Sequence, residues 1–382
     1  MKIGIPRERR PNEARVAVSP DTVKKLIALG AEVIVEAGSG LSSAVPDGAY
    51  AAVGARIAHD EADALGDADI VLKVQRPLTS GEGGPDELAL MKPGALLIGI
   101  LAPYAAREQL ADYAGRNVTA FAMEFLPRIT RAQSMDVLSS QANLAGYRAV
   151  IEAAAVFGRG FPMMMTAAGT VAAARVLVMG AGVAGLQAIA TARRLGGVVS
   201  ATDVRPAAKE QVQSLGATFV AVEDEEFKQA ETAGGYAKEM SDAYKAKQAA
   251  LTAETIKKQD VIITTALIPG RKAPVLVSEE MVKTMKPGSV IVDLAVEQGG
   301  NCPLSEPGKI VMKHGVTIVG LVNLPSRIAV DASALYARNL LAFLTPMISK
   351  ETKALKIDWE DEIVKATVLT RDGKIVHPSF TS

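Results

Sequence analysis

The 382-residue sequence has little of what builds disulfide scaffolds or metal centres. Its single cysteine, Cys302, excludes an internal disulfide and any zinc site made of several cysteines, and it fits a reducing cytosol. Only three histidines are present, His59, His314 and His377, which argues against a histidine-rich metal site. All three stand in helix-start or loop contexts, so we expect surface or structural roles for them and no bound metal.

The sequence also lacks an excess of charge and a membrane-spanning segment. Lys+Arg and Asp+Glu number 42 each, so there is no electrostatic case for binding nucleic acid or an anionic membrane surface. The uncharged run from Val176 to Ala192 is close to spanning length, but its glycines indicate a strand, a turn and a helix. The charged start at Lys2 does not resemble a signal peptide. We therefore expect a cytoplasmic protein with no transmembrane helix.

A glycine-rich segment in the middle of the chain is the most informative feature present. Residues 176–179 form a short apolar run, Gly180, Gly182 and Gly185 follow, and residues 186–194 have a helical pattern. This order of strand, glycine turn and helix is the dinucleotide-binding fingerprint in its expected context. The sequence therefore predicts a bound dinucleotide.

Each residue of the fingerprint has a physical task. Gly180 allows the tight turn, Gly182 lets the backbone approach a pyrophosphate, and Gly185 allows the helix to pack closely on the strand. A second apolar strand, 197–202, ends at Asp203, whose carboxylate can accept hydrogen bonds from a ribose and would repel a 2′-phosphate. Arg205 could instead accommodate the 2′-phosphate of NADP, so NADP stays open as an alternative. The Asp203 carboxylate precedes Arg205 and stands in the position expected for the ribose-binding acid, so we favour NAD(H).

Strand-like and helix-like segments alternate on both sides of the fingerprint, which predicts an α/β fold with two doubly wound, Rossmann-like parallel-sheet domains separated by a cleft. We expect an N-terminal domain of residues 1–140 plus 327–382, because the C-terminal part has no sheet of its own, and an NAD(H)-binding domain of residues 141–326. The expected strands are 2–6, 32–36, 70–74, 95–101 and 118–123 in the first domain, and 176–179, 197–202, 218–222, 261–265, 290–294 and 316–321 in the second.

Two loops are candidates for the ligand site. Residues 127–141, at the domain junction, offer a guanidinium, an amide, a carboxylate and hydroxyls that could orient a nicotinamide, with an Arg–Asp pair bracing the loop. An ordinary capped loop is the alternative. Residues 223–248 are rich in charge and contain paired glycines, which indicates either a solvated helix pair or a lid with Tyr236 at its tip.

The sequence offers no obvious general acid or base. An alcohol or amine dehydrogenase must move a proton as well as a hydride, yet the strand that ends at Leu101 is aliphatic. Arg15 and Lys73 are basic residues in apolar surroundings. Lys73 lies within a predicted strand, where an unpaired charge is costly, so it either faces a cleft or pairs with an acid.

With these residues identified, the whole chain resembles the soluble NAD(H)-binding component, domain I or the alpha-1 polypeptide, of proton-translocating nicotinamide nucleotide transhydrogenase. The matching motifs are Ile5-Pro-Arg-Glu-Arg-Arg-Pro, Val74-Gln-Arg-Pro, Arg131-Ala-Gln-Ser-Met-Asp, Phe161-Pro-Met-Met-Met-Thr, Gly180-Ala-Gly-Val-Ala-Gly, Ala230-Glu-Thr-Ala-Gly-Gly-Tyr, Thr264-Thr-Ala-Leu-Ile-Pro-Gly and Asp293-Leu-Ala-Val-Glu-Gln-Gly-Gly-Asn.

Alanine dehydrogenase is the sister family with the same fold. Its pattern is met at Arg15 and Lys73, which look like its substrate-side residues. It is not met around Leu101, where that family carries a catalytic histidine, nor at Glu297, which replaces its catalytic aspartate. These departures argue against amino-acid oxidation.

The resemblance implies direct hydride transfer from NADH on this chain to NADP on a separate subunit, coupled to proton movement by a membrane-embedded component. It implies a homodimer, peripheral to the inner membrane through its partners. The catalytic residues that it implies are Arg128, Gln133, Asp136, Ser139 and, on a mobile loop, Tyr236. The other cofactor-binding residues that it implies are Val137, Leu138, Gly180, Ala181, Gly182, Val183, Asp203, Val204, Arg205, Gly235, Gln248 and Leu267. An alanine-dehydrogenase-like enzyme and a non-catalytic NAD sensor remain the alternatives.

Overall fold

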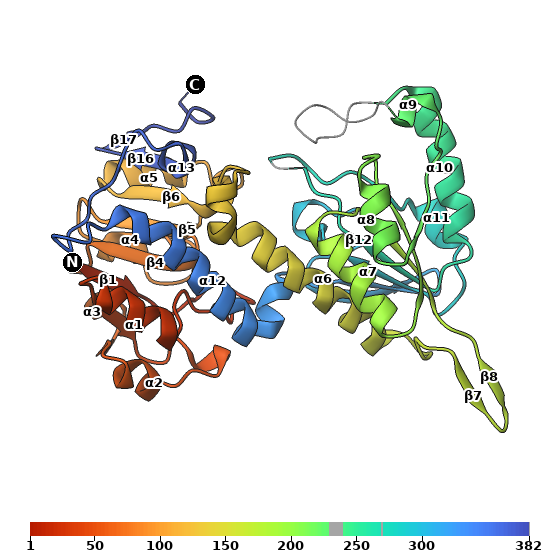
Figure 1. Ribbon diagram of the computed structural model, residues 1–382, viewed down its shortest axis with the longest axis horizontal. Helices are drawn as coiled ribbons and strands as arrows, with labels where there is room; N and C mark the ends of the chain where they lie inside the picture. Colours follow the sequence, from red (N-terminus) through yellow and green to blue (C-terminus); the bar gives the residue numbers. More distant parts are fainter. Residues whose placement is uncertain (229–239, 269, 382) are drawn as a thin grey trace. The chain divides into compact units, whose positions relative to one another are not determined.

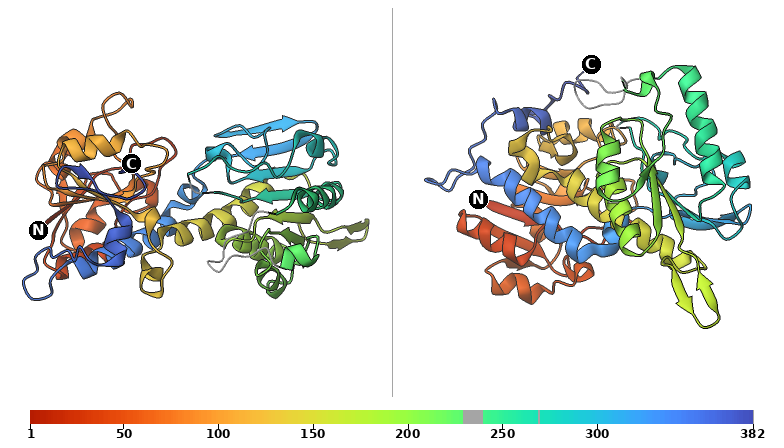
Figure 2. Two further views of the ribbon diagram at one scale, coloured as in Figure 1. Left: turned by 90° about the horizontal axis from the view of Figure 1, so that it is seen from above. Right: turned by 45° about the vertical axis from the view of Figure 1, so that its right-hand side comes forward.

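The computed structural model describes residues 1–228, 240–268 and 270–381. The chain divides into two compact units, one made of Met1–Gln141 and Ser326–Ser382 and the other of Ala142–Pro325. We call them unit 1 and unit 2. Each contains a largely parallel sheet with helices on both faces (Figures 1 and 2), so the predicted α/β fold class with two Rossmann-like sheets is confirmed.

In unit 1, the described strands form one eight-stranded sheet. All neighbours pair in parallel except β16 and β17, which add antiparallel strands beside β6. In spatial order the strands are β17 (Lys374–Ile375), β16 (Val368–Arg371), β6 (Thr119–Ala122), β5 (Leu96–Ile100), β4 (Ile70–Gln75), β1 (Lys2–Ile5), β2 (Glu32–Glu36) and β3 (Arg56–Ala58). The C-terminal part therefore joins the first sheet, as expected, but β3, β16 and β17 were not predicted.

The helices of unit 1 cover both faces of this sheet because alternate strand residues point to opposite sides. They are α1 (Pro20–Ala28), α2 (Asp47–Ala52), α3 (Glu61–Leu65), α4 (Glu87–Leu90), α5 (Gln109–Gly115), α12 (Ala329–Leu344) and α13 (Glu362–Thr367). Ser19 caps the first helix, since its hydroxyl accepts from the Thr22 backbone N–H.

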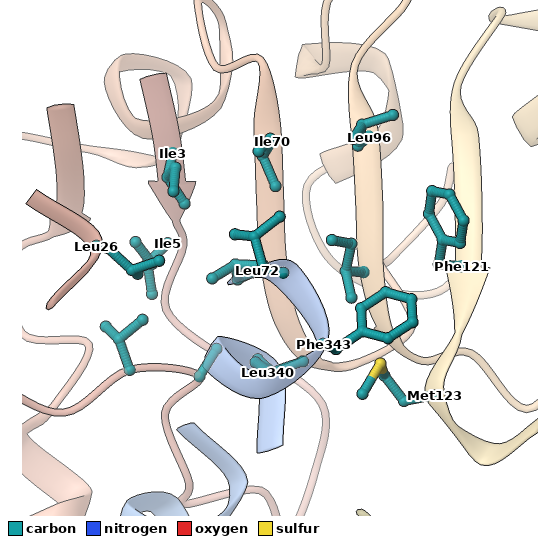
Figure 3. Packing of buried hydrophobic residues seen from close by; sticks show 14 of the residues in the cluster. Ile3, Ile5, Leu26, Ile70, Leu72, Leu96, Phe121, Met123, Leu340 and Phe343 are labelled. Atoms are coloured by element: carbon teal, nitrogen blue, oxygen red, sulfur yellow. The ribbon is translucent and has the colours of Figure 1, made fainter. Parts of the chain in front are cut away.

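The α12 helix is the main cover of one face of the unit 1 sheet. Figure 3 shows its Leu340 and Phe343 directed at strand residues that include Leu72 and Phe121. The rings of Phe121 and Phe343 lie 5.7 Å apart in an edge-to-face arrangement. Burial of this apolar cluster fixes the C-terminal part of the chain on the N-terminal sheet.

In unit 2, the main sheet has seven described strands, and β9 lies between β10 and β12. The spatial order is β11 (Thr218–Phe219), β10 (Val198–Thr202), β9 (Arg175–Met179), β12 (Val261–Thr264), β13 (Val290–Asp293), β15 (Val316–Gly320) and β14 (Lys309–Lys313). The chain proceeds outward from β9 on one side through β10 and on the other through β12. Open α/β sheets bind ligands at the carboxyl end of such a switch point.

The helices that pack on the unit 2 sheet are α6 (Val137–Val156), α7 (Val183–Arg194), α8 (Ala208–Ser214), α9 (Glu225–Lys228), α10 (Asp242–Ile256) and α11 (Glu279–Lys283). The first of them, α6, begins within the residues of unit 1 and continues into unit 2. It touches α7 closely, because a Cβ on Gly146 would lie 2.0 Å from the Ala184 carbonyl oxygen.

A two-stranded hairpin extends from unit 2 (Figure 1) and was not predicted. Its strands are β7 (Met164–Thr166) and β8 (Gly169–Val171), and the Met165 side chain is 79% exposed. In the residues that the structure describes, no helix combines the length and the apolar character that crossing a membrane requires.

The contact between α6 and α7 gives a test of the unit 2 packing. Gly146→Ala should destabilise the protein by about 1–3 kcal/mol, since the added Cβ must displace backbone. Gly158→Ala is the matched control in the same unit, because no described atom lies within 4 Å of its Cβ position. Thermal unfolding followed by circular dichroism should separate the two variants, and equal melting temperatures would contradict this packing.

Candidate functional site

The glycine turn after β9 has the geometry that the fingerprint predicts. Gly180 has a φ of +104°, which side-chain-bearing residues rarely adopt, and a Cβ on Gly185 would lie 1.8 Å from the Gly180 carbonyl oxygen. Helix α7 therefore passes directly against the end of the strand. It begins at Val183, three residues before the predicted start at Leu186, because Gly182 in extended conformation already serves as its N-cap.

Gly182 differs from the other two glycines of the fingerprint. Its φ of −76° and ψ of −169° suit any residue, and no described atom lies within 4 Å of its Cβ position. The fold itself therefore does not require a glycine there. Within the described residues, no side chain caps the first turn of α7. An uncapped helix N-terminus beside open space is suited to an anion such as a pyrophosphate.

Asp203 lies at the end of β10 with its side chain only 7% exposed. Its carboxylate accepts from the Ala181 backbone N–H at 2.7 Å and from the Arg205 N–H at 2.9 Å. The Arg205 guanidinium donates to both carboxylate oxygens, at 2.9 and 3.0 Å. This pairing directs the guanidinium to the carboxylate, whereas the sequence left open that it serves a 2′-phosphate.

Apolar side chains stand exposed around the same carboxyl edge. Val183 follows β9, Val204 follows β10, and Leu267 and Ile268 follow β12, each between 41% and 57% exposed. Large apolar groups gathered at the mouth of a polar turn are typical of a site that covers a planar ring. Ile268 was not among the predicted residues, although it adjoins Leu267 in the motif.

Gln248 connects two elements at this edge. Its Nε2 donates to the Thr202 hydroxyl at 3.3 Å and its Oε1 accepts from the Val222 N–H at 2.9 Å. The predicted residues Gly235 and Tyr236 lie outside the described residues. On either side of them the chain forms α9 and the N-terminal end of α10.

Two residues that shape this edge were missed by the sequence analysis. The Thr265 hydroxyl donates to the Gly180 carbonyl at 3.0 Å and so ties the end of β12 to the glycine turn. Fully buried Asn301 accepts from the Ala266 N–H and donates to the carbonyls of Ala266 and Pro274. Both lie within the quoted motifs, which were the only signal that could have found them.

The second candidate loop belongs to unit 1, where Asp136 caps helix α6. Its carboxylate accepts from the Ser139 N–H at 2.9 Å and from the Ser139 hydroxyl at 2.5 Å. Leu138 is exposed, whereas Val137 is wholly buried and offers a ligand no surface here. Arg128 and Gln133 are both exposed.

The Arg–Asp pair that braces this loop joins residues far apart in the sequence. Arg131 donates to both carboxylate oxygens of Asp361, which also caps α13. Asp361 lies outside the segment 127–141, whose only aspartate is Asp136. That segment alone could therefore not identify Asp361 as the partner of Arg131. The 3-10 helix that carries Arg131 and Gln133 is η3 (Thr130–Met135).

The two buried cations are paired with carboxylates. Lys73 is 1% exposed, and its Nζ lies 2.8 Å from Glu87 and 3.4 Å from Glu8. Burial raises the pKa of Glu8 to about 7, although the Lys73 charge opposes this shift. Arg15 forms a two-pronged pair with Glu13. The paired-acid alternative for Lys73 is thereby confirmed.

The end of β5 carries no histidine. Leu101 is buried, and Ala102, with a φ of +49°, follows it. The Glu124 carboxylate accepts from the backbone N–H groups of both residues. Burial raises the pKa of Glu124 to about 7. Its oxygens hold the backbone turn, and Glu297 likewise accepts from a backbone group, the Asn323 N–H at 3.1 Å.

The histidines have the surface or structural contexts that the sequence predicted. His59 is largely exposed beside Asp60, His314 lies 3.0 Å from Glu279, and His377 stacks on Phe125. Burial lowers the pKa of His377.

Two models of known protein domains together match nearly the whole chain. Residues 4–145 match the model of the alanine dehydrogenase/PNT N-terminal domain, and residues 149–378 match that of the alanine dehydrogenase/PNT C-terminal domain. The chain belongs to the alanine dehydrogenase/PNT family. Membership of this family supports an oxidoreductase that binds NAD(H) through a Rossmann-like fold.

Within the alanine dehydrogenase/PNT family, the chain is more similar to transhydrogenase subunits than to alanine dehydrogenases. It is 63% identical over 381 residues to the first portion of the NAD(P) transhydrogenase alpha subunit of Rhodospirillum rubrum, covering 100% of this chain and 99% of that one. The Rickettsia prowazekii subunit of the same name is 50% identical over 99% of this chain and 96% of its own. Alanine dehydrogenase of Bacillus subtilis is 29% identical over 99% and 93%.

Solved structures give the same order of similarity. The transhydrogenase crystal structure from Sinorhizobium meliloti superimposes with a TM-score of 0.89 at 56% identity, over 98% of this chain and 100% of that one. An L-alanine dehydrogenase superimposes with a TM-score of 0.81 at 26% identity, over 100% and 98%. The relatives thus support a transhydrogenase role, and alanine dehydrogenase is only distantly related.

Alanine at Gly182 and alanine at Gly185 should have different effects, the first on NADH affinity and the second on stability. Gly182→Ala should keep the wild-type melting temperature and lose on the order of tenfold or more in NADH affinity, since its Cβ projects into the open space at the turn. Gly185→Ala should instead lower the melting temperature by about 5 °C or more. Isothermal titration with NADH and thermal unfolding distinguish these effects. Wild-type affinity in Gly182→Ala would rule out this site.

Proposed function

We propose that this chain is the NAD(H)-binding subunit of a proton-translocating transhydrogenase, and that hydride passes directly from NADH held here to NADP⁺ held by a separate subunit. A third, membrane-embedded component couples that exchange to proton translocation. The observation that carries the proposal is the combination of an intact dinucleotide turn at Gly180–Gly185 with an aliphatic strand end at Leu101 and Ala102. A hydride-transfer site without a proton relay fits two nicotinamide rings better than an alcohol or amine.

The proposed pyrophosphate site is the backbone of Gly180, Ala181, Gly182 and Val183. The open Cβ position of Gly182 supports it, because a glycine that the fold does not need is explained by a group that approaches its backbone. The N-terminus of α7 supplies partial positive charge. Thr265 keeps the Gly180 carbonyl turned toward β12, away from the proposed phosphates.

The proposed adenosine site uses Asp203, Val204 and Leu267. The Asp203 carboxylate already accepts four hydrogen bonds, one from the Ala181 N–H and three from Arg205, so ribose hydroxyls would have to replace the Arg205 guanidinium on it. Because a 2′-phosphate would approach this carboxylate, NAD(H) is preferred over NADP(H). Gln248 and Gly235 complete the proposed set.

The proposed nicotinamide site uses Arg128, Gln133, Asp136 and Ser139 of unit 1. Tyr236, which lies outside the described residues, is also proposed as a catalytic residue. The exposed amide of Gln133 is suited to a carboxamide, which offers both a donor and an acceptor. The dinucleotide supplies the hydride chemistry, and the chain contributes position and orientation.

A homodimer and peripheral attachment to the inner membrane through partner subunits are included in the proposal. The exposed methionines Met163, Met164 and Met165 around the β7–β8 hairpin support a protein partner, because apolar side chains gathered on a projecting hairpin are typical of an interface. The similarity to proteins named as portions of a transhydrogenase alpha subunit supports partner subunits.

The deciding experiment is a partner-dependent exchange assay. The purified chain mixed with an NADP(H)-binding subunit should transfer hydride from NADH to NADP⁺, and neither protein should do so alone. Tight NADH binding without exchange in the mixture would contradict the proposal.

The same preparation tests the alternative enzyme. NADH oxidation that depends on pyruvate and ammonia, by this chain alone, would favour an alanine-dehydrogenase-like activity. Ala102 and the occupied Glu124 carboxylate at the end of β5 lead us to expect none.

A further inference from the structure

A buried side chain of α12, Asn339, holds the loop that carries Gln133. The Asn339 Nδ2 donates to the Ser134 carbonyl at 2.9 Å, and the Asn339 Oδ1 accepts from the Ser140 hydroxyl at 2.7 Å. Asn339 is buried, whereas Gln133 and Ser134 are exposed. One amide therefore connects the Ser134–Met135 peptide, one residue beyond Gln133, with the first turn of α6.

Asn339 is the last side chain of a longer hydrogen-bonded chain. The Arg15 Nη1 donates to the Gln141 Oε1 at 2.8 Å, and the Gln141 Nε2 donates to the Ser140 hydroxyl at 3.3 Å. The Ser140 hydroxyl then donates to Asn339, which donates to the Ser134 carbonyl. Every member lies within unit 1, and each step donates in the same direction.

The direction of this chain follows from the chemistry of its ends. A guanidinium only donates, so Gln141 must present its oxygen to Arg15 and its nitrogen to Ser140. A backbone carbonyl only accepts, so Asn339 must present its nitrogen to Ser134. The Ser140 hydroxyl also lies 3.2 Å from a second acceptor, the Val137 carbonyl. If it donated there, the Asn339 amide could flip. The flipped amide would point its oxygen at the Ser134 carbonyl, and the two oxygens would repel each other.

The Arg15 guanidinium, where this series of hydrogen bonds begins, is paired with other buried groups. Arg15 is paired with Glu13, and the Gln75 Nε2 donates to the same Glu13 carboxylate at 2.7 Å. Arg15 therefore has a structural task that requires no substrate carboxylate. Aligned donors in a buried chain polarise and strengthen one another.

We propose that Asn339 is a positioning residue for hydride transfer, which orients the Gln133 loop through the chain that begins at Arg15. The proposal rests on the function proposed above, in which Gln133 contacts the nicotinamide. Ser134 follows Gln133 directly, so fixing the Ser134 carbonyl restricts the backbone from which the Gln133 amide projects. Small errors in the position of reacting groups cost large factors in rate.

Asn339→Asp tests this with little change of shape. Aspartate keeps an acceptor for Ser140 but presents an oxygen to the Ser134 carbonyl in place of a donor. We expect hydride exchange at saturating NADH to fall by about tenfold or more, while the NADH dissociation constant changes much less. Protonated aspartic acid regains a donor, so the rate of the variant relative to wild type should rise as the pH is lowered. Ser140→Ala should show a smaller loss in the same direction.

Ser333→Ala is the matched control. Ser333 is also buried on α12, where its hydroxyl accepts from the Val16 N–H and contacts Ser43, outside the chain of donors that leads to Ser134. Its loss should affect stability but leave the exchange rate of the folded protein unchanged. Equal reductions in Asn339→Asp and Ser333→Ala, or a wild-type rate in Asn339→Asp, would overturn the proposal.

Backbone hydrogen–deuterium exchange provides a readout that does not depend on the partner. Amides of residues 130–136 should exchange faster in Asn339→Asp than in wild type or Ser333→Ala. If the wild-type protein transferred no hydride with its partner, the proposed function would fail, and these amide rates would still decide whether Asn339 orders the loop. Unchanged rates in Asn339→Asp would contradict its positioning role.

Discussion

The approach of Gly185 to the Gly180 carbonyl is the constraint on which the carboxyl edge of unit 2 depends. Because a Cβ on Gly185 would lie 1.8 Å from that oxygen, α7 can begin directly over the end of β9 only with glycine there. The same carbonyl accepts from Thr265, which ties in the neighbouring strand β12. The backbone at Gly182 is thereby left facing open space, and this is the space in which the proposed function puts the pyrophosphate.

Unit 1 orders its loop by a different physical means. There the constraint is not a steric contact between backbones but a set of donors and acceptors that runs from Arg15 through Gln141 and Ser140 to Asn339. Each buried polar group must find a partner, so the network specifies one arrangement of the loop over α12 and penalises others. The glycine turn of unit 2 and the loop of unit 1 are thus each restricted to one arrangement, the first by a steric contact and the second by hydrogen bonds.

The sequence predicted most strands, the fold class and the glycine turn, since apolar periodicity and glycine spacing are local signals. It did not predict the antiparallel edge strand β14, which is short and partly polar, or the exposed β7–β8 hairpin. Nor could it pair Arg131 with Asp361 or Asn339 with Ser134, because contacts between residues some 200 positions apart leave no local pattern. The residues of the glycine turn were therefore predictable, and the partners that hold the loop of unit 1 were not.

The central claim is that hydride passes directly between two dinucleotides without exchange with water. NADH carrying deuterium at the transferred C4 position would be mixed with this chain, its NADP(H)-binding partner and NADP⁺ in ordinary water. Mass spectrometry of the NADPH formed should find the deuterium fully retained, because a hydride that passes directly from one C4 carbon to the other never becomes an exchangeable proton. Loss of the label to water would contradict direct transfer.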